Sequence, residues 1–246
     1  MASNFGKTIQ VSTFGASHGY AIGGIVEGLP CGHTIDIDEL QAFLKRRAPG
    51  QNQLQTQRKE ADIPEFLSGM VDGMLSGSPL AFMIRNTSQH SGDYNNLRDI
   101  PRPSHADFTA RMRYGDKVDM RGGGHFSARL TAPLCVAGGI ALQLLREKGI
   151  EIHGHLKQVG TIQDTPIDMV HPDMKALAKI ATETIAMVDA DKRPEVENLV
   201  MKLKKDGDST GGIVSVVTTG LPLALGNPNF HGIENRLARV IFGVPA

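Results

Sequence analysis

Several residue types are scarce in this sequence, and each scarcity excludes a class of function. Tryptophan is absent and aromatic residues make up 5% of the 246 residues, which disfavours a stacking platform for single-stranded nucleic acid. Lysine plus arginine balances aspartate plus glutamate at 26 each, so any anion-binding site has to be local. Nucleic acid is therefore not an expected partner.

Cysteine and long apolar runs are also scarce. Cys31 and Cys135 are the two cysteines, and both have small or apolar neighbours, which favours buried free thiols in a reducing cytoplasm over a disulfide. No apolar run reaches the roughly 20 residues of a membrane span, and the start of the chain lacks the apolar core of a signal peptide. We therefore expect a cytoplasmic protein without a membrane partner.

Glycine, by contrast, is abundant, with 28 residues, and residues 121–129 read RGGGHFSAR. A glycine run before a helix exposes backbone N–H groups, and the helix N-terminus adds a partial positive charge, which favours phosphate or an anionic cofactor. The stretch is neither a Walker A loop nor a G-x-G-x-x-G fingerprint. The alternative interpretation is a structural turn in which Ser127 caps the next helix.

The hydrophobic pattern predicts an α+β fold in one domain over residues 1–246, more layered than doubly wound. Asp36 and Glu39 form a capping-box-like start to a helix that stops before Pro49-Gly50. A long irregular region is expected over 86–119, a polar loop over 51–62, and a buried strand over 213–217. The other expected helices cover 132–148, about 172–187 and 194–206, and the other expected strands cover 8–13, 20–28, 80–84 and 151–162.

Two histidines lie in turns of small residues, His18 in ASHGYAIGG and His105 in RPSHADF. Such turns suggest rings exposed enough to exchange a proton near neutral pH, although a surface or structural role is the alternative for each. The H-x-H pair of His153 and His155 lacks an accompanying cluster of carboxylates or cysteines, so no metal site is expected.

Arginines recur in the Gly/Pro-rich parts of the chain, which suggests a polyanionic small-molecule ligand. Surface ion pairs are the alternative. The residues concerned are Arg46, Arg47, Arg58, Arg102, Arg121 and Arg129.

Eight blocks of the sequence together resemble the chorismate synthase family, and they follow the order found in that family over nearly the whole chain. Each is weak alone, but the series is specific. The blocks are FGASHGYAIGGIVEGLP, LKRRAPGQ, TQRKEAD, LSGMVDGMLSGSPLAFMIRN, Asp93-Tyr94, RPSHADFTARMRYG, DMRGGGHFSARLTAPLCVAGGIA and DSTGGIVSVVTTGLPLALGNPNFHGIENRLA.

The resemblance implies a layered β-α-β sandwich that assembles as a homotetramer. It also implies a lyase that converts 5-enolpyruvylshikimate 3-phosphate to chorismate and phosphate by 1,4-anti elimination. Members of the family require reduced FMN, although the reaction has no net redox change. Some use NADPH to reduce their own flavin, through the basic stretch around Arg47.

The resemblance further implies a role for each matching residue. His18 would protonate or hydrogen-bond reduced flavin, and His105 would donate a proton to the departing phosphate. Arg47 and Arg129 would hold the phosphate and carboxylates of the substrate. The FMN site would be lined by His125, Phe126 and Ser127, with Arg47 as a further cofactor contact.

Two departures from the family pattern stand out. Many relatives carry arginine and a small residue where this chain has His125 and Phe126, so charge at position 125 depends on pH. The sequence also stops at VIFGVPA, inside a strand-like block, whereas family members continue by about a third of their length, so we expect a C-terminally truncated form. The alternatives are a non-catalytic remnant that keeps the fold and binds phosphate or flavin, and a phosphate- or nucleotide-binding module without flavin.

Overall fold

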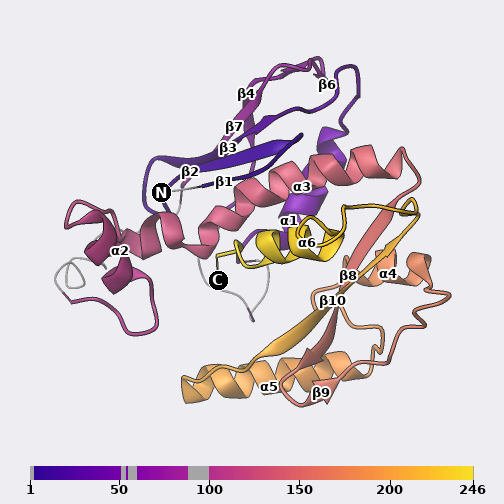
Figure 1. The fold of residues 1–246 in the computed structure, drawn as a ribbon. Helices are drawn as coiled ribbons and strands as arrows, with labels where there is room; N and C mark the ends of the chain where they lie inside the picture. The colour runs from indigo at the N-terminus through magenta and orange to yellow at the C-terminus, as the bar shows by residue number, and fades with distance from the viewer. Residues whose placement is uncertain (1–2, 51–53, 55–59, 88–99, 246) are drawn as a thin grey trace. The chain divides into compact units, whose positions relative to one another are not determined.

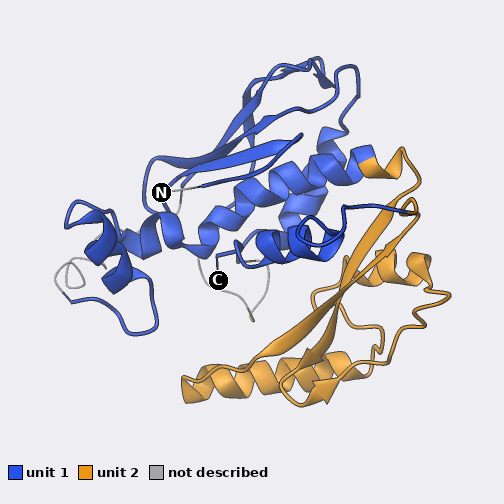
Figure 2. Cartoon of the chain, in the orientation of Figure 1, with its two compact units in different colours: residues 1–50, 57–144, 224–246 blue, residues 51–56, 145–223 orange. Residues whose placement is uncertain are grey.

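The computed structural model describes residues 3–50, 54, 60–87 and 100–245. Its contacts divide the chain into two compact units (Figure 2). Unit 1 comprises residues 1–50, 57–144 and 224–246, and unit 2 comprises residues 51–56 and 145–223. The single domain expected over 1–246 thus contains two compact units.

Unit 1 is built on a five-stranded antiparallel sheet with the strand order β1-β2-β3-β7-β4 (Figure 1). A small hairpin of two further strands accompanies it. The sheet strands are β1 (Asn4–Gly6), β2 (Gln10–Gly15), β3 (Ala21–Glu27), β4 (Glu65–Ser68) and β7 (Leu80–Arg85), and the hairpin is β5 (Met70–Val71) with β6 (Met74–Leu75).

Two helices, α1 (Ile37–Arg47) and α3 (Thr131–Arg146), pack with the sheet around the core of unit 1. The two helices pack closely at Gly139, where an added Cβ atom would lie 2.5 Å from Leu40 Cδ1. By length and apolar composition alone, residues 121–146 would suffice to cross a membrane. Instead, α3 is the core helix of unit 1, with Val136 and Ile140 fully buried beneath the sheet residues.

Local signals placed α1 correctly. Asp36 is its N-cap, and the Asp36 side chain accepts a hydrogen bond from Glu39 N at 2.9 Å. Two other expectations for unit 1 were wrong. The region 86–119 contains a helix, α2 (Asp107–Tyr114). The VIFGVPA block begins in the last residues of α6 (Ile233–Ile241) and continues as turn and bend to residue 244, instead of being strand-like.

Unit 2 is a three-stranded antiparallel sheet in the order β10-β8-β9, packed with two helices. The expected strand over 151–162 is β8 (Glu151–Val159), which turns back through β9 (Ile162–Gln163). The predicted helix over 172–187 is shorter, α4 (Met174–Ile180), while α5 (Lys192–Asp206) ends at Gly207 as expected. The strand expected to be buried, β10 (Gly212–Thr219), is an edge strand with Val214 66% exposed.

Candidate active site

The three consecutive glycines of RGGGHFSAR form a backbone turn that other residues rarely adopt. Gly122, Gly123 and Gly124 have φ angles of 59°, 87° and 56°. Positive φ is costly for any residue with a Cβ atom, so the glycines are required by the conformation itself. The loop leads into a 3₁₀ turn over Ala128–Leu130, and Ser127 caps this turn by accepting a hydrogen bond from Arg129 N at 3.3 Å.

The glycine loop packs directly against the SHG turn. A Cβ atom at Gly122 would lie 2.0 Å from His18 Nδ1, and Ser17 N donates to Gly124 O at 3.0 Å. His18 is 8% exposed, so the expectation of an exposed ring was wrong at this position. Because Gly122 lacks a side chain, the loop can cover the imidazole. The structure therefore brings together two of the sequence blocks.

A buried carboxylate joins the two arginines assigned to the substrate. Arg47 donates from Nε and Nη2 to Asp62 Oδ2, at 2.8 and 2.5 Å, and Arg129 donates from Nη1 to Asp62 Oδ1. The Asp62 side chain is 0% exposed, and those of Arg47 and Arg129 are 19% and 4% exposed. The ion pairs lie in a poorly solvated environment, where Coulombic interactions are strong.

Asn86 connects this cluster to the SHG turn. Its Oδ1 atom accepts from Arg129 Nε at 3.1 Å, while its Nδ2 atom donates to Ala16 O at 3.1 Å and Gly19 O at 2.8 Å. A second buried carboxylate, Glu60, lies 3.9 Å from Arg129 Nη2. A continuous network thus runs from the turn that carries His18 to both arginines.

His125 has hydrogen bonds at both ring nitrogens. Its Nδ1 lies 2.8 Å from Gly15 O, and its Nε2 lies 2.7 Å from Ser3 Oγ. A carbonyl oxygen only accepts, so Nδ1 carries a proton, and the neutral ring accepts from the Ser3 hydroxyl. His125 therefore ties the glycine loop to the N-terminal strands.

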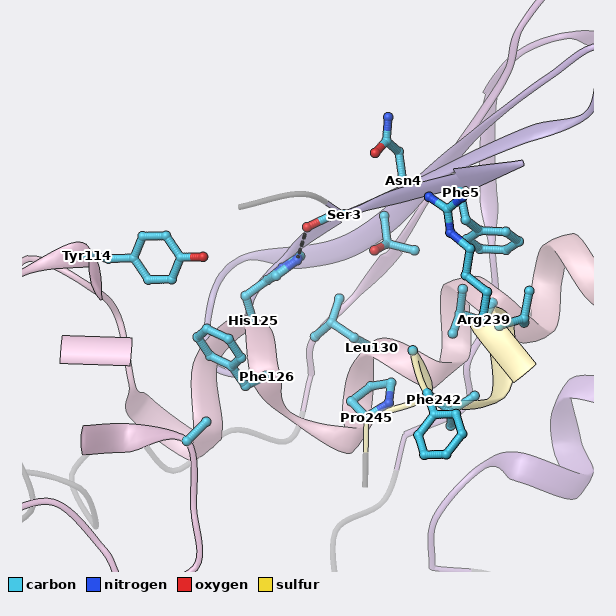
Figure 3. Close-up of a pocket in the computed structure, with 16 residues that line it drawn as sticks. Ser3, Asn4, Phe5, Tyr114, His125, Phe126, Leu130, Arg239, Phe242 and Pro245 are labelled. Carbon is cyan, nitrogen blue, oxygen red and sulfur yellow. Dashed lines mark hydrogen bonds between the residues drawn. The ribbon is translucent and has the colours of Figure 1, made fainter. Parts of the chain in front are cut away.

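A cavity of about 620 Å³ lies beside His125 in unit 1 (Figure 3). Phe126 lies on its wall, with its ring centroid 6.4 Å from that of Tyr114. Arg239 brings a guanidinium group to the opposite wall from α6 (Figure 3). The cavity thus combines aromatic and aliphatic surface with one cationic group, which suits a flat ligand that carries an anionic substituent.

His105 is exposed at the turn before α2, in contrast to His18. Its Nδ1 donates to Pro103 O at 2.9 Å, so Nε2 is the nitrogen directed to other partners. Beside it, Arg102 donates from Nε and Nη2 to the Asp107 carboxylate at 2.8 and 2.9 Å. The hydrogen bonds from Arg102 hold the pKa of Asp107 below its ordinary value.

The arginines singled out in the sequence differ in their surroundings. Arg121 pairs with Asp119 at 2.8 Å, and the hydrogen bond raises the pKa of Arg121. Arg46 stacks on the Phe43 ring, 5.5 Å from its centroid. Arg58 and the Asp93-Tyr94 block lie outside the described residues. Of the five singled-out arginines that the structure describes, Arg47, Arg102, Arg121 and Arg129 pair with carboxylates. The pair of Arg121 is a surface ion pair, as in the alternative interpretation, whereas those of Arg47 and Arg129 involve the buried carboxylate of Asp62.

Sequence reasoning missed two residues that organise the site, Asp62 and Asn86. Asp62 ends the TQRKEAD block and Asn86 ends the LSGMVDGMLSGSPLAFMIRN block, but neither residue was assigned a role. Their contacts join segments 15, 67 and 43 positions apart. A single sequence carries no local signal for such contacts.

The fold and the site define an α+β protein in which a glycine-rich loop, a buried histidine and a buried arginine–carboxylate cluster meet in one unit. A protein-family model described as "Chorismate synthase" matches residues 9–246. The chorismate synthase of Lancefieldella parvula is 42% identical over 257 residues, which cover 100% of this chain and 67% of that protein. The chorismate synthase of Bacteroides thetaiotaomicron is 42% identical over 246 residues, with the same coverage of the two chains.

A solved structure described as "Crystal Structure of Chorismate Synthase" shares the fold, with a TM-score of 0.70 and 25% sequence identity. The match covers 90% of this chain and 61% of that one. The chain therefore belongs to the chorismate synthase family, a family of lyases, as its eight sequence blocks predicted. It spans about two thirds of the length of the relatives it matches.

Proposed function

We propose that this chain catalyses, with reduced FMN, the 1,4-anti elimination of phosphate from 5-enolpyruvylshikimate 3-phosphate to give chorismate. The observation that carries the proposal is the match of the whole chain, at 42% identity, to chorismate synthases. The packing of Gly122 against His18 supports it, because two blocks that define the family meet at one place. In the reaction one ring C–H bond and one C–O bond break, and the products are chorismate, phosphate and a proton.

Two of the residues expected at the FMN site, His125 and Phe126, line the cavity beside His125, whereas His18, Ser127 and Arg47 do not. The cavity would hold flavin mononucleotide. Its volume of about 620 Å³ lies within the usual range of cofactor sites, which is roughly 300–1,000 Å³. Phe126 would contact the isoalloxazine ring, and Arg239 would pair with the phosphate. Reduced FMN, when bound, would lend electron density as the substrate's phosphate leaves and then assist removal of the hydrogen.

Two histidines have separate roles in this proposal. His18 is held by the glycine loop and would hydrogen-bond or protonate the cofactor. His105 is exposed, and its Nδ1 is fixed on Pro103 O, so in the protonated ring Nε2 would donate to the departing phosphate. The resemblance also assigns a cofactor contact to Ser127, which caps the 3₁₀ turn and does not line the cavity.

Arg47 and Arg129 would bind the phosphate and carboxylate groups of the substrate. Arginine suits this role because its planar guanidinium group forms two parallel hydrogen bonds with an oxyanion. If NADPH reduces the flavin, the basic stretch around Arg47 would also bind this nicotinamide cofactor. We further propose that the chain assembles as a homotetramer and works in the cytoplasm. Both cysteines are free thiols, which is in keeping with a reducing compartment.

The direct test incubates the chain anaerobically with 5-enolpyruvylshikimate 3-phosphate and either reduced or oxidised FMN. We expect chorismate and phosphate in equal amounts with reduced FMN only. A chain that binds FMN but releases no phosphate would instead be a non-catalytic remnant. A chain that does not quench FMN fluorescence would be a flavin-independent anion-binding module.

The proposed cofactor cavity has a separate test. Phe126→Ala should weaken FMN binding, measured by fluorescence quenching, because the variant loses aromatic contact with the ring. Phe108→Ala is the matched control, since Phe108 is exposed on α2 and does not line the cavity. Equal FMN affinities for the two variants would place the cofactor elsewhere.

A further inference from the structure

Asp62 has a backbone conformation that is unusual for a residue with a side chain. Its φ angle is +51°, and its side chain is 0% exposed. Aspartate and asparagine tolerate this left-handed region better than other non-glycine residues, but a buried residue stays there only when its surroundings hold it. In this backbone conformation the Asp62 carboxylate lies in the interior of unit 1, between two arginines.

Both oxygens of this carboxylate are used, each by a different arginine. Oδ2 accepts from Arg47, which ends α1, and Oδ1 accepts from Arg129, which lies in the 3₁₀ turn before α3. Arg47 also donates from Nη1 to Thr131 Oγ1, at 3.2 Å, at the start of α3. One carboxylate therefore sets the distance and orientation of two guanidinium groups from separate elements.

The network leaves hydrogen-bonding capacity on Arg129. Within the part of the chain that the structure describes, the buried Nη2 atom of Arg129 has no hydrogen-bond partner, although Glu60 Oε2 lies 3.9 Å away. Glu60 Oε2 accepts two hydrogen bonds from Thr87, one from the backbone N at 3.1 Å and one from Oγ1 at 2.9 Å. A buried donor without an acceptor is rare in folded proteins, so Arg129 Nη2 has the capacity to bind an acceptor that the described residues do not supply.

We propose that Asp62 is a positioning residue, which holds Arg47 and Arg129 in a fixed relative orientation so that both can bind one oxyanion of the substrate. The proposal rests on the proposed function, in which these arginines bind the substrate. Without the carboxylate, two cations would face each other in a poorly solvated place and would move apart. Their binding of a shared anion would then lose its preorganisation.

The test compares Asp62→Asn with Asp72→Asn. Asp72 is the matched control because it also has a positive φ angle, of +50°, but its side chain is exposed. Asparagine tolerates the same backbone conformation at both positions, so the comparison isolates the buried charge. We expect Asp62→Asn to raise the KM for 5-enolpyruvylshikimate 3-phosphate about tenfold or more while kcat changes much less. Asp72→Asn should leave both constants unchanged.

A structural readout separates this proposal from the proposed function. In nitrogen-15 spectra of the full chain, the Nε–H signal of Arg47 and the Nη1–H signals of Arg129, which are the groups bonded to Asp62, should exchange slowly with solvent and lose this protection in Asp62→Asn. The signal of Arg85, which pairs with Glu65 away from Asp62, is the internal reference. If the wild-type chain releases no phosphate, the proposed function fails, and these signals still decide the role of Asp62. Unchanged signals, or a fall in kcat without a rise in KM, would overturn the proposal.

Discussion

The two histidines assigned to catalysis occupy contrasting environments. His18 is 8% exposed and packs against Gly122. The turn that carries His18 is bonded through Gly19 O to Asn86, which in turn bonds Arg129. His105 is exposed on a turn, where a hydrogen bond to Pro103 O orients its ring. The first position is fixed by packing from several elements, and the second by local contacts.

This difference indicates a division of labour within unit 1. A group that must keep one orientation toward a bound cofactor benefits from a rigid, buried setting. A group that donates a proton to a leaving phosphate needs access to the substrate and to solvent protons. The following predictions, from the largest expected effect to the smallest, test whether the two regions differ in this way.

Gly122→Ala should have the largest effect. The new Cβ atom would lie 2.0 Å from His18 Nδ1, at a φ angle of +59°, so the loop or the ring must move. We expect a loss of more than about 3 kcal/mol in the free energy of unfolding, measured by urea denaturation. Gly32→Ala is the control, because Gly32 also has positive φ, at +84°, but no atom lies within 4 Å of the added Cβ. Gly32→Ala should lower the free energy of unfolding by about 1 kcal/mol. If the two variants lose the same amount, Gly122 is needed only for its own backbone conformation and not for contact with His18.

Asn86→Ala should have the next largest effect. The change removes three hydrogen bonds and leaves Arg129 Nε and two backbone carbonyls without their partner. We expect a loss of roughly 2–4 kcal/mol in the free energy of unfolding. Asn198→Ala, at an exposed position on α5, should be nearly neutral. A mild effect of Asn86→Ala would mean that the SHG turn is held without this network.

Arg102→Ala should have a smaller effect that depends on pH. The folded-state pKa of Asp107 is lowered, first by its hydrogen bond with Arg102, so the pair stabilises the folded chain above the ordinary aspartate pKa of about 3.9. That stability is lost as the pH falls through the folded-state value. The wild type should therefore exceed Arg102→Ala by about 1 kcal/mol at neutral pH. This difference should shrink below about pH 3.9, and a constant difference down to strong acid would contradict the assignment.

Local signals in the sequence were enough to predict much of unit 1. Asp36 and Glu39 predicted the start of α1, and the strands expected over 8–13 and 20–28 correspond to β2 and β3. The signals were insufficient for α2, which is eight residues long and has no side-chain cap at Ala106. The helix α6 was not predicted, although its apolar residues follow a helical period. The VIFGVPA block that overlaps its last residues was expected to be strand-like.

The candidate site could be predicted in its parts but not in its assembly. The SHG and RGGG blocks were identified, yet the burial of His18 depends on Gly122, more than 100 positions along the chain. The ion pairs of Arg47 and Arg129 with Asp62 are also tertiary contacts. The sequence led us to expect that both arginines bind a ligand, and the structure shows that each also has a carboxylate partner within the chain. Cys31 was expected to be buried but is exposed. Its local sequence could not show this, because burial depends on which distant segments of the chain pack nearby.

The most direct test of the contrast between the two histidines measures FMN affinity and turnover together in His18→Ala and His105→Ala. The account predicts that His105→Ala binds FMN like the wild type but loses about 100-fold or more in turnover, as expected for removal of a general acid. His18→Ala should lose both FMN affinity and turnover. Full turnover in His105→Ala, or unchanged FMN affinity in His18→Ala, would contradict it.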